Sequence, residues 1–131
     1  MLDVTVSQAE HLDSLREKYD ITLILAFGSQ ITGKTHRSSD LDIGLLFGRG
    51  PLTLDCISEL QKIFPSYEVD PVWLNRADPL LLGQITSHSQ LLSGPETAYH
   101  EFRCYAFQRY ADFLPYLALE AKTNARRLEG Y

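Results

Sequence analysis

Cysteine is scarce in this chain of 131 residues, and basic residues are outnumbered by acidic ones. The two cysteines, Cys56 and Cys104, form no C-x-x-C motif and no His–Cys cluster, which argues against a zinc or redox motif. Lys and Arg number 12 against 17 Asp and Glu, and the net charge of -5 argues against direct binding of nucleic acid. No apolar run approaches the roughly 18 residues that span a membrane.

The chain also shows no basic segment followed by an apolar one at its start, as a signal peptide would. We therefore expect a cytoplasmic protein whose two thiols are inert and buried. Hydrophobic residues make up 44% and charged residues 22%, which is close to the globular average and excludes disordered and fibrous classes. The length predicts a single domain over residues 1–131.

Hydrophobic periodicity predicts an α/β (α+β) domain with a small mixed sheet flanked by helices. A capping box of Ser7 and Glu10 predicts a helix over about residues 8–19. Apolar runs predict strands over 21–27, 41–47 and 67–73, with a helix over 52–64 between the last two. Asp78 and Pro79 predict the start of a short helix through Ile85. A long helix then follows from about residue 95 to 127, ended or kinked at Pro115.

Two nucleotide-binding patterns overlap in residues 28–42, which read GSQITGKTHRSSDLD. Gly28, Gly33, Lys34 and Thr35 match the P-loop, G-x-x-x-x-G-K-[ST]. That motif needs a helix directly after Lys-Thr, but only five residues separate Thr35 from the next apolar run. The P-loop interpretation is therefore disfavoured.

The second pattern is Gly28-Ser29, ten further residues, then Asp40-x-Asp42, as in nucleotidyltransferases. Gly28 lacks a Cβ, so phosphate oxygens can approach its backbone, and Ser29 can open a short helix whose N–H groups face a triphosphate. Asp40 and Asp42 project from one face at the start of a strand. Two adjacent carboxylates stay ionised together only with a cation between them, and oxygen ligands favour Mg²⁺.

Asp70 in the next strand supplies a third carboxylate. Three acids on neighbouring strands can hold two metal ions about 4 Å apart, and Asp70 is placed to accept the proton of an attacking hydroxyl. The alternative is that these acids are an ordinary solvated strand end. Their position after Gly28-Ser29 and a buried strand favours the catalytic interpretation.

At these residues the chain resembles the minimal nucleotidyltransferase (MNT) family of the DNA polymerase β superfamily. The matching segments are AFGS (26–29), Gly33, SDLDIGLLF (39–47) and EVD (68–70). The closest similarity is to MntA-like antitoxins, which are paired with HEPN-domain toxins. The resemblance implies ATP as substrate, Mg²⁺ as cofactor and AMP transfer to a tyrosine of the toxin.

The resemblance also assigns roles by residue. It places the metal at Asp40, Asp42 and Asp70, and the nucleotide at Gly28, Ser29, Arg37 and Ser39. Family members often carry Arg near the positions of Gln30 and Thr32, and here Lys34 and Arg37 are the nearby basic residues. Pro71 removes a ladder donor, which predicts that its strand is an edge strand or ends there.

About 60 residues follow Asp70, enough for two helices but not for a full acceptor-binding domain. We therefore expect the acceptor, or half of the cleft, to come from another chain. Two alternatives stay open. One is nucleotidyl transfer to a small molecule such as an antibiotic, and the other is an antitoxin that acts by occlusion without catalysis.

The last helix is rich in aromatic residues. One stripe at helical spacing is expected to pack on the domain's own sheet: Tyr99, Phe102, Ala106, Tyr110 and Phe113. Tyr105, Phe107 and Tyr116 cannot share that face, so we expect this helix to contribute to a partner or homo-oligomer contact.

Overall fold

The computed structural model describes residues 1–32 and 39–129, with side chains through residue 126. Its described strands form one sheet in the order β3–β2–β1–β4. The strands are β1 (Ile21–Phe27), β2 (Asp40–Phe47), β3 (Glu68–Trp73) and β4 (Ser89–Ser93). β1 pairs antiparallel with β2 and β4, whereas β2 and β3 are parallel. The predicted small mixed sheet is confirmed, and β3 with its Pro71 is an edge strand as expected.

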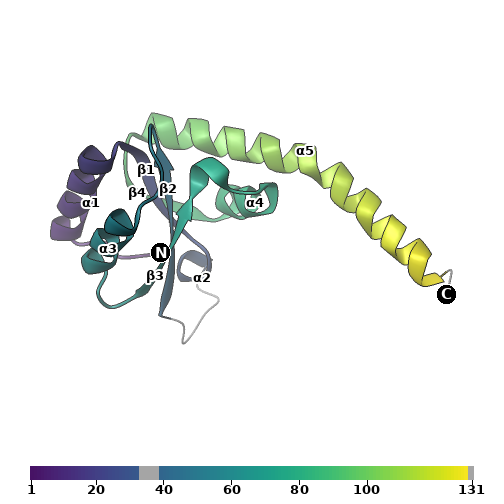
Figure 1. The fold of residues 1–131 in the computed structure, drawn as a ribbon, viewed down its shortest axis with the longest axis horizontal. Coiled ribbons are helices and arrows are strands. Elements are labelled where there is room, and N and C mark those ends of the chain that lie inside the picture. Colours follow the sequence, from purple (N-terminus) through teal and green to yellow (C-terminus); the bar gives the residue numbers. More distant parts are fainter. Residues whose placement is uncertain (33–38, 130–131) are drawn as a thin grey trace.

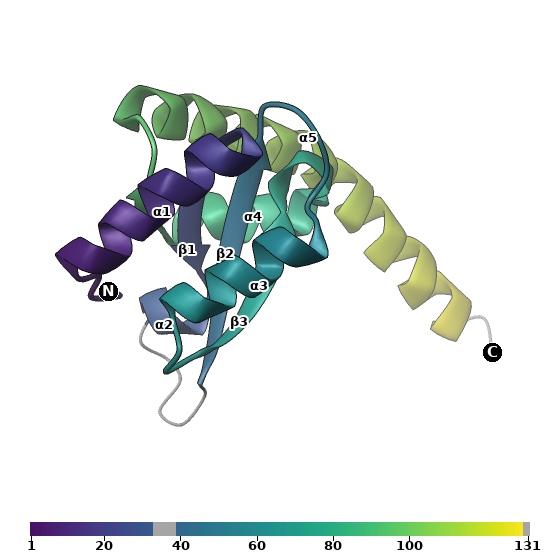
Figure 2. The same cartoon turned by 60° about the vertical axis from the view of Figure 1, so that its left-hand side comes forward.

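Helices cover both faces of the sheet (Figure 1). The helices α1 (Val6–Tyr19) and α3 (Leu54–Ile63) cover one face, and α4 (Pro79–Ser87) and α5 (Glu96–Glu129) cover the other, as Figure 2 shows. A four-residue helix, α2 (Ser29–Thr32), follows β1, and the 3-10 turn η1 (Leu74–Arg76) follows β3.

Each face has its own apolar core. Leu41, Ile43 and Leu45 of β2 pack under α1 and α3 with Leu12 and Leu60. On the other face, side chains of β1, α4 and α5 form the second core: Leu23, Leu25, Phe27, Leu82, Ile85, Phe102 and Ala106. The alternation along β2 and β1 therefore sorts side chains between two helical layers.

The first helix is capped two residues earlier than the sequence suggested. The Thr5 hydroxyl accepts a hydrogen bond from the Gln8 backbone N–H, and the Gln8 side chain accepts one from the Thr5 N–H. This capping box replaces the predicted one of Ser7 and Glu10. Both pairs have the required spacing, but starting at Thr5 lets the Gln8 amide also donate to the Ile63 carbonyl at the end of α3.

The strand β4 was not predicted. It is short, half-buried along most of its length, and lies at the sheet edge beside β1. The Gln90 side chain anchors the start of the chain here, since its amide donates to the Leu2 carbonyl and its oxygen accepts from the Leu2 N–H. These long-range contacts stabilise the strand, and a local pattern of apolar residues cannot predict them.

The helix α5 continues through Pro115 to residue 129. Its 34 residues correspond to a length of about 51 Å. Its first half packs against α4 and β1 through Phe102 and Ala106. Its second half projects away from the domain (Figure 1). Within the described residues, no helix combines the length and apolar character needed to cross a membrane.

The two cysteines differ in environment. Cys56 is buried, and this burial, together with the charge of Glu59, raises the pKa of its thiol to about 11. Cys104 is exposed on α5, so the expectation that both thiols lie in the core is wrong for this one. Cys104 lies at a helix position that faces solvent because Phe102 and Ala106 on either side of it turn inward.

Candidate active site

The predicted acidic residues lie at one end of the sheet, on the face covered by α4 and α5. Leu41 and Ile43 point to the opposite helical layer, so Asp40 and Asp42 share the other face of β2. In the parallel ladder Asp42 is the register partner of Asp70, and Asp40 is the partner of Glu68. Neighbouring strands are about 4.8 Å apart, so these carboxyl groups lie side by side.

Gly28 is in direct contact with this acidic group. Its φ of +83° belongs to the left-handed region that favours glycine. A Cβ at Gly28 would lie 2.2 Å from Oδ2 of Asp42, closer than any real contact. The Asp42 carboxyl therefore fills the space that a side chain at residue 28 would need. The Gly28 carbonyl in turn accepts hydrogen bonds of 3.1 Å from the N–H groups of Ile31 and Thr32, which starts α2.

The electrostatics reflect the crowding of like charges. Partial burial raises the pKa of Asp42, and a hydrogen bond with the Asp70 carboxyl and the negative charges of Asp70 and Asp40 raise it further. Such a pair shares a proton, or it binds a cation that makes both negative charges favourable.

The donor set fits a hard divalent cation. Asp42 and Asp70 are close enough to hydrogen bond, and the charge of Asp40 is felt by Asp42. Among residues 1–32 and 39–126, no three His, Cys, Asp or Glu side chains already form a metal cage. Asp40 and Asp70 are exposed, and Asp40 lies two residues before Asp42 on the same face of β2. All three side chains offer carboxylate oxygens, the type of ligand that Mg²⁺ prefers.

A cavity of about 540 Å³ is lined in part by Gly28, the residue that packs against Asp42. Gly28 and Thr32 form one wall, and α4 and α5 form the other with Leu80, Gly83, Gln84, Ser87, His88 and Tyr110. Its size is in the range of small-molecule sites, and its wall mixes apolar groups with a few polar ones. Gly28 thus connects the acidic pair to a concave space.

Three further residues were predicted to bind the nucleotide: Ser29, Ser39 and Arg37. Ser29 is the first residue of α2, directly after Gly28. Ser39 is exposed, and its carbonyl accepts a 2.8 Å hydrogen bond from the Glu68 N–H, which aligns β2 with β3. Arg37, like Lys34 and Thr35 of the disfavoured P-loop pattern, lies outside the described residues.

Gln84, His88 and Tyr110 were missed by the sequence reasoning. They reach the site through the packing of α4 on α5, where the Tyr110 ring lies over Gly83 so closely that a Cβ there would be 2.5 Å from the ring. Gly83 within an otherwise apolar helical segment was the one available signal, since a glycine at such a place marks a close approach.

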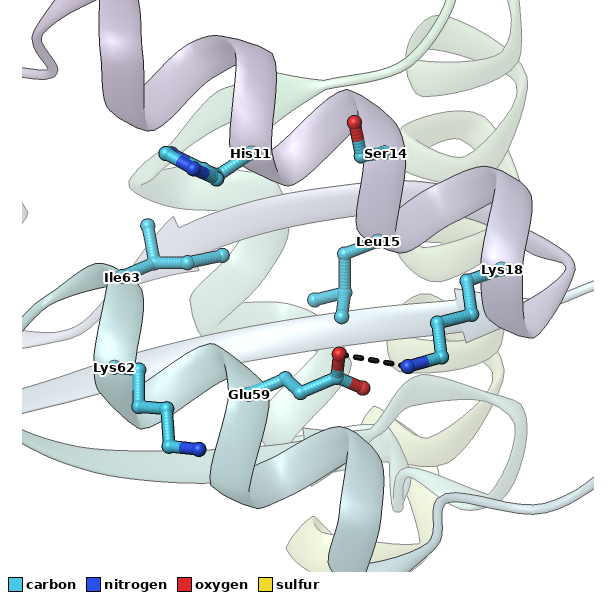
Figure 3. A pocket seen from close by; sticks show the side chains of 7 residues that line it. All are labelled: His11, Ser14, Leu15, Lys18, Glu59, Lys62 and Ile63. Atoms are coloured by element: carbon cyan, nitrogen blue, oxygen red, sulfur yellow. Dashed lines mark hydrogen bonds and ion pairs between the residues drawn. The ribbon is translucent and has the colours of Figure 1, made fainter.

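A second cavity lies on the other side of the sheet, between α1 and α3 (Figure 3). Its volume is about 340 Å³, and a 2.8 Å ion pair between Lys18 and Glu59 spans it. The Tyr19 hydroxyl also donates to Glu59. Because the sheet separates this cavity from Asp42 and Asp70, it takes no part in the acidic site.

Comparison with solved structures supports the same fold. The chain superimposes with a TM-score of 0.61 on a chain of a toxin–antitoxin complex crystallised with AMP-PNP, at 25% identity, covering 92% of this chain and 96% of that one. A complex of the tri-AMPylated HEPN toxin of Shewanella oneidensis with an MNT antitoxin is similar at 23% identity and a TM-score of 0.58, with 94% and 95% covered. An MntA–HepT toxin–antitoxin complex is similar at 20% identity and a TM-score of 0.59, with 95% and 97% covered.

No curated protein sequence matches the chain. A family profile does, and it describes the nucleotidyltransferase domain of polymerase β. The match extends over residues 10–97, from α1 to the start of α5, and includes Gly28-Ser29 and all three aspartates. The chain belongs to the polymerase β nucleotidyltransferase family.

Proposed function

We propose that the chain transfers AMP from ATP to a hydroxyl group of a HEPN-domain toxin, most simply a tyrosine, and so acts as its antitoxin. The observation that carries this proposal is the packing of Asp42 against both Gly28 and Asp70. This packing places the acidic pair directly beside the glycine–serine segment, and nucleotidyl transfer needs the metal-binding acids and the phosphate-binding segment to be adjacent. We place the reaction in the cytoplasm, where ATP is supplied.

The nucleotide would lie between the acidic group and the cavity. In this proposal Gly28 and Ser29 bind the triphosphate, Ser39 and Arg37 contribute further contacts, and the nucleoside enters the cavity beside Gly28. Backbone N–H groups after a strand end are suitable donors to phosphate oxygens. The adjacent cavity is large enough for a nucleoside by the usual range of ligand sites.

Asp40, Asp42 and Asp70 would hold Mg²⁺, with room for two ions, as the donor set allows. When bound, the metal supplies charge neutralisation for the triphosphate and makes the attacking hydroxyl more acidic. The proposal is supported by the raised pKa of Asp42. Burial raises it first, the hydrogen bond and charge of Asp70 raise it further, and a bound cation would favour the ionised carboxylate.

The residues of the chain position the reaction and accept a proton. The acceptor oxygen attacks the α-phosphorus, the bond from that phosphorus to the oxygen bridging the β-phosphate breaks, and pyrophosphate leaves. Asp70 is exposed at the edge of the sheet, so it can receive the hydroxyl proton from an acceptor arriving from outside. Most of the rate enhancement comes from orientation and charge, as in other phosphoryl-type transfers.

The acceptor belongs to a second protein in this proposal. Beyond β3 the described chain adds one further strand, the turn η1 and the helices α4 and α5, which close the cavity but form no second domain. The similar structures are complexes of toxin and antitoxin, one with an AMPylated HEPN toxin. They support a HEPN-type partner for this chain.

The experiment is the intact mass of a HEPN-type partner co-expressed with the chain. Wild type should add whole AMP units to the partner, and Asp42→Asn should add none while the protein stays folded. Glu17→Gln, an exposed acid on α1, is the matched control and should behave like wild type. A tight complex with no mass gain would replace the proposal by occlusion, and absence of any complex would favour a small-molecule acceptor.

A further inference from the structure

The projecting half of α5 carries an apolar stripe that the described residues leave largely exposed. Its residues recur at alternating intervals of four and three: Phe107, Ala111, Leu114, Ala118, Ala121 and Ala125. This is the heptad spacing of a coiled-coil seam, maintained over about 27 Å of helix. We call these six residues the heptad stripe.

The heptad stripe is distinct from the face that packs on the domain. With about 100° per residue, it lies about a third of a turn from the buried direction of Phe102 and Ala106. Phe107 is 57% exposed and Leu114 is 43% exposed. The three alanines that follow are exposed, and only Ala111 is partly covered. A helix half of this length is marginal in water by itself, so an apolar seam along it calls for a second helix.

We propose that the heptad stripe pairs with the heptad stripe of a second copy of this chain, in an antiparallel coiled coil with its two-fold axis beside Tyr116. Side-chain sizes along the stripe are complementary about that point, large on one side of it and small on the other. In this register Phe107 faces Ala125 of the second copy, and Leu114 faces Ala118 of the second copy. Ala111 faces Ala121 at the remaining layer.

Every large side chain of the seam thus meets a small one. Knobs fit into holes without overlap, and the alanines allow the helices to approach closely. A parallel pair would place Phe107 against Phe107 and Ala118 against Ala118, which combines crowding at one end with gaps at the other. Size therefore selects the antiparallel arrangement, and an isologous interface of this kind closes as a dimer.

Charge along the seam agrees with this register. Six residues flank the stripe: Gln108, Tyr110, Pro115, Leu117, Lys122 and Asn124. Lys122 is the one charged residue among them, and it would face Gln108 of the second copy. Tyr110 would face Asn124, and Leu117 would face its own equivalent across the axis. No like charges meet among these six flanking residues, so the seam itself contains no charge repulsion.

The surface beyond the stripe has room for the end of the second helix. A hollow of about 440 Å³ lies in line with Phe107 toward the start of α5, lined also by Thr86, His100, Arg103, Cys104 and Gln108. In the antiparallel register, the last turn of the second copy's α5 runs toward this hollow. The pairing proposed here does not depend on the proposed function.

The test is the mass of the full chain in solution by analytical ultracentrifugation, from micromolar to submillimolar concentration. Wild type should move toward twice the 14.9 kDa of one chain as concentration rises. Leu114→Glu buries an unpaired charge in the seam and should weaken the dimer by at least about 100-fold. Leu119→Glu is the matched control, because Leu119 is 63% exposed and lies about a third of a turn away from the heptad stripe, and it should leave the dimer intact.

The register is tested by cross-linking in a Cys104→Ser background. A short bismaleimide should join two copies through Leu117→Cys, which faces itself across the axis, and not through Leu119→Cys. A chain that stays monomeric, a dimer insensitive to Leu114→Glu, or cross-linking at both positions would overturn the proposal. A monomer whose Leu114→Glu variant fails to bind a HEPN-type partner would assign the stripe to that partner instead.

Discussion

The substitution Gly28→Ala tests how the glycine and the acidic pair depend on each other. An alanine here has two penalties. Its φ of +83° is unfavourable for a residue with a side chain, by about 1–2 kcal/mol. Its Cβ would also lie 2.2 Å from Oδ2 of Asp42, so the carboxyl has to move. We expect a loss of stability of about 2–3 kcal/mol, or roughly 8–12 °C in Tm for a chain of this size.

The effect on activity should exceed the effect on stability. A carboxyl displaced by about 1 Å loses its place relative to Asp70, and misplacement on this scale reduces rates by about 100-fold. The assay is AMP transfer to a HEPN-type partner well below the Tm of the variant, with Tm measured separately by calorimetry.

Gly50→Ala is the matched control for backbone strain. Gly50 has nearly the same φ, +80°, but a Cβ there would meet nothing within 4 Å. We expect it to lose about 1 kcal/mol of stability and no activity. The reasoning is refuted if Gly28→Ala transfers AMP as fast as Gly50→Ala, because Asp42 would then not need the space that Gly28 leaves.

Three further outcomes follow from the contacts described above. Because the native state raises the pKa of Asp42, its charge lowers stability at neutral pH, and the penalty fades as the pH falls and Asp42 is protonated. Asp42→Asn should therefore melt higher than metal-free wild type at neutral pH. The difference should disappear at about pH 3, below the unfolded pKa of Asp42, and Mg²⁺ should raise only the wild-type Tm; a variant that melts lower at neutral pH would contradict this. Gly83→Ala places a Cβ 2.5 Å from the Tyr110 ring, and it should lower stability by about 1–3 kcal/mol in urea unfolding and weaken nucleotide binding; unchanged binding would remove the cavity from the site. Phe102→Ala should lose about 3–5 kcal/mol in the same urea assay by emptying the core under α5, and a loss below 1 kcal/mol would mean that α5 docks elsewhere.

Local patterns were sufficient for much of the fold. The run from Ile21 to Phe27 is β-branched and apolar and ends at a glycine, and β1 has those bounds. Asp78 with Pro79 predicted the start of α4 because the Asp78 carboxyl caps the helix at the Leu81 N–H. These signals lie within a few residues of the structure they determine.

The remaining features depend on contacts between distant segments. β4 exists because β1 offers it an edge and Gln90 binds Leu2, 88 residues away. The spacing of Asp40 and Asp42 predicted a shared face, but their approach to Gly28 depends on the register of β1 with β2. The cavity walls on α4 and α5 come together only when Gly83 meets Tyr110. Sequence patterns therefore predicted the residues of the acidic site but not the space beside it.

The central claim is that the acidic pair transfers a nucleotidyl group rather than a phosphate. The most direct measurement is the transfer of label to the HEPN-type partner from ATP labelled at either its α- or its γ-phosphate. The account predicts label on the partner from the α-position only, release of the γ-label as pyrophosphate, and loss of both signals in Asp42→Asn. Label on the partner from the γ-position, or α-label transfer that survives Asp42→Asn, would contradict it.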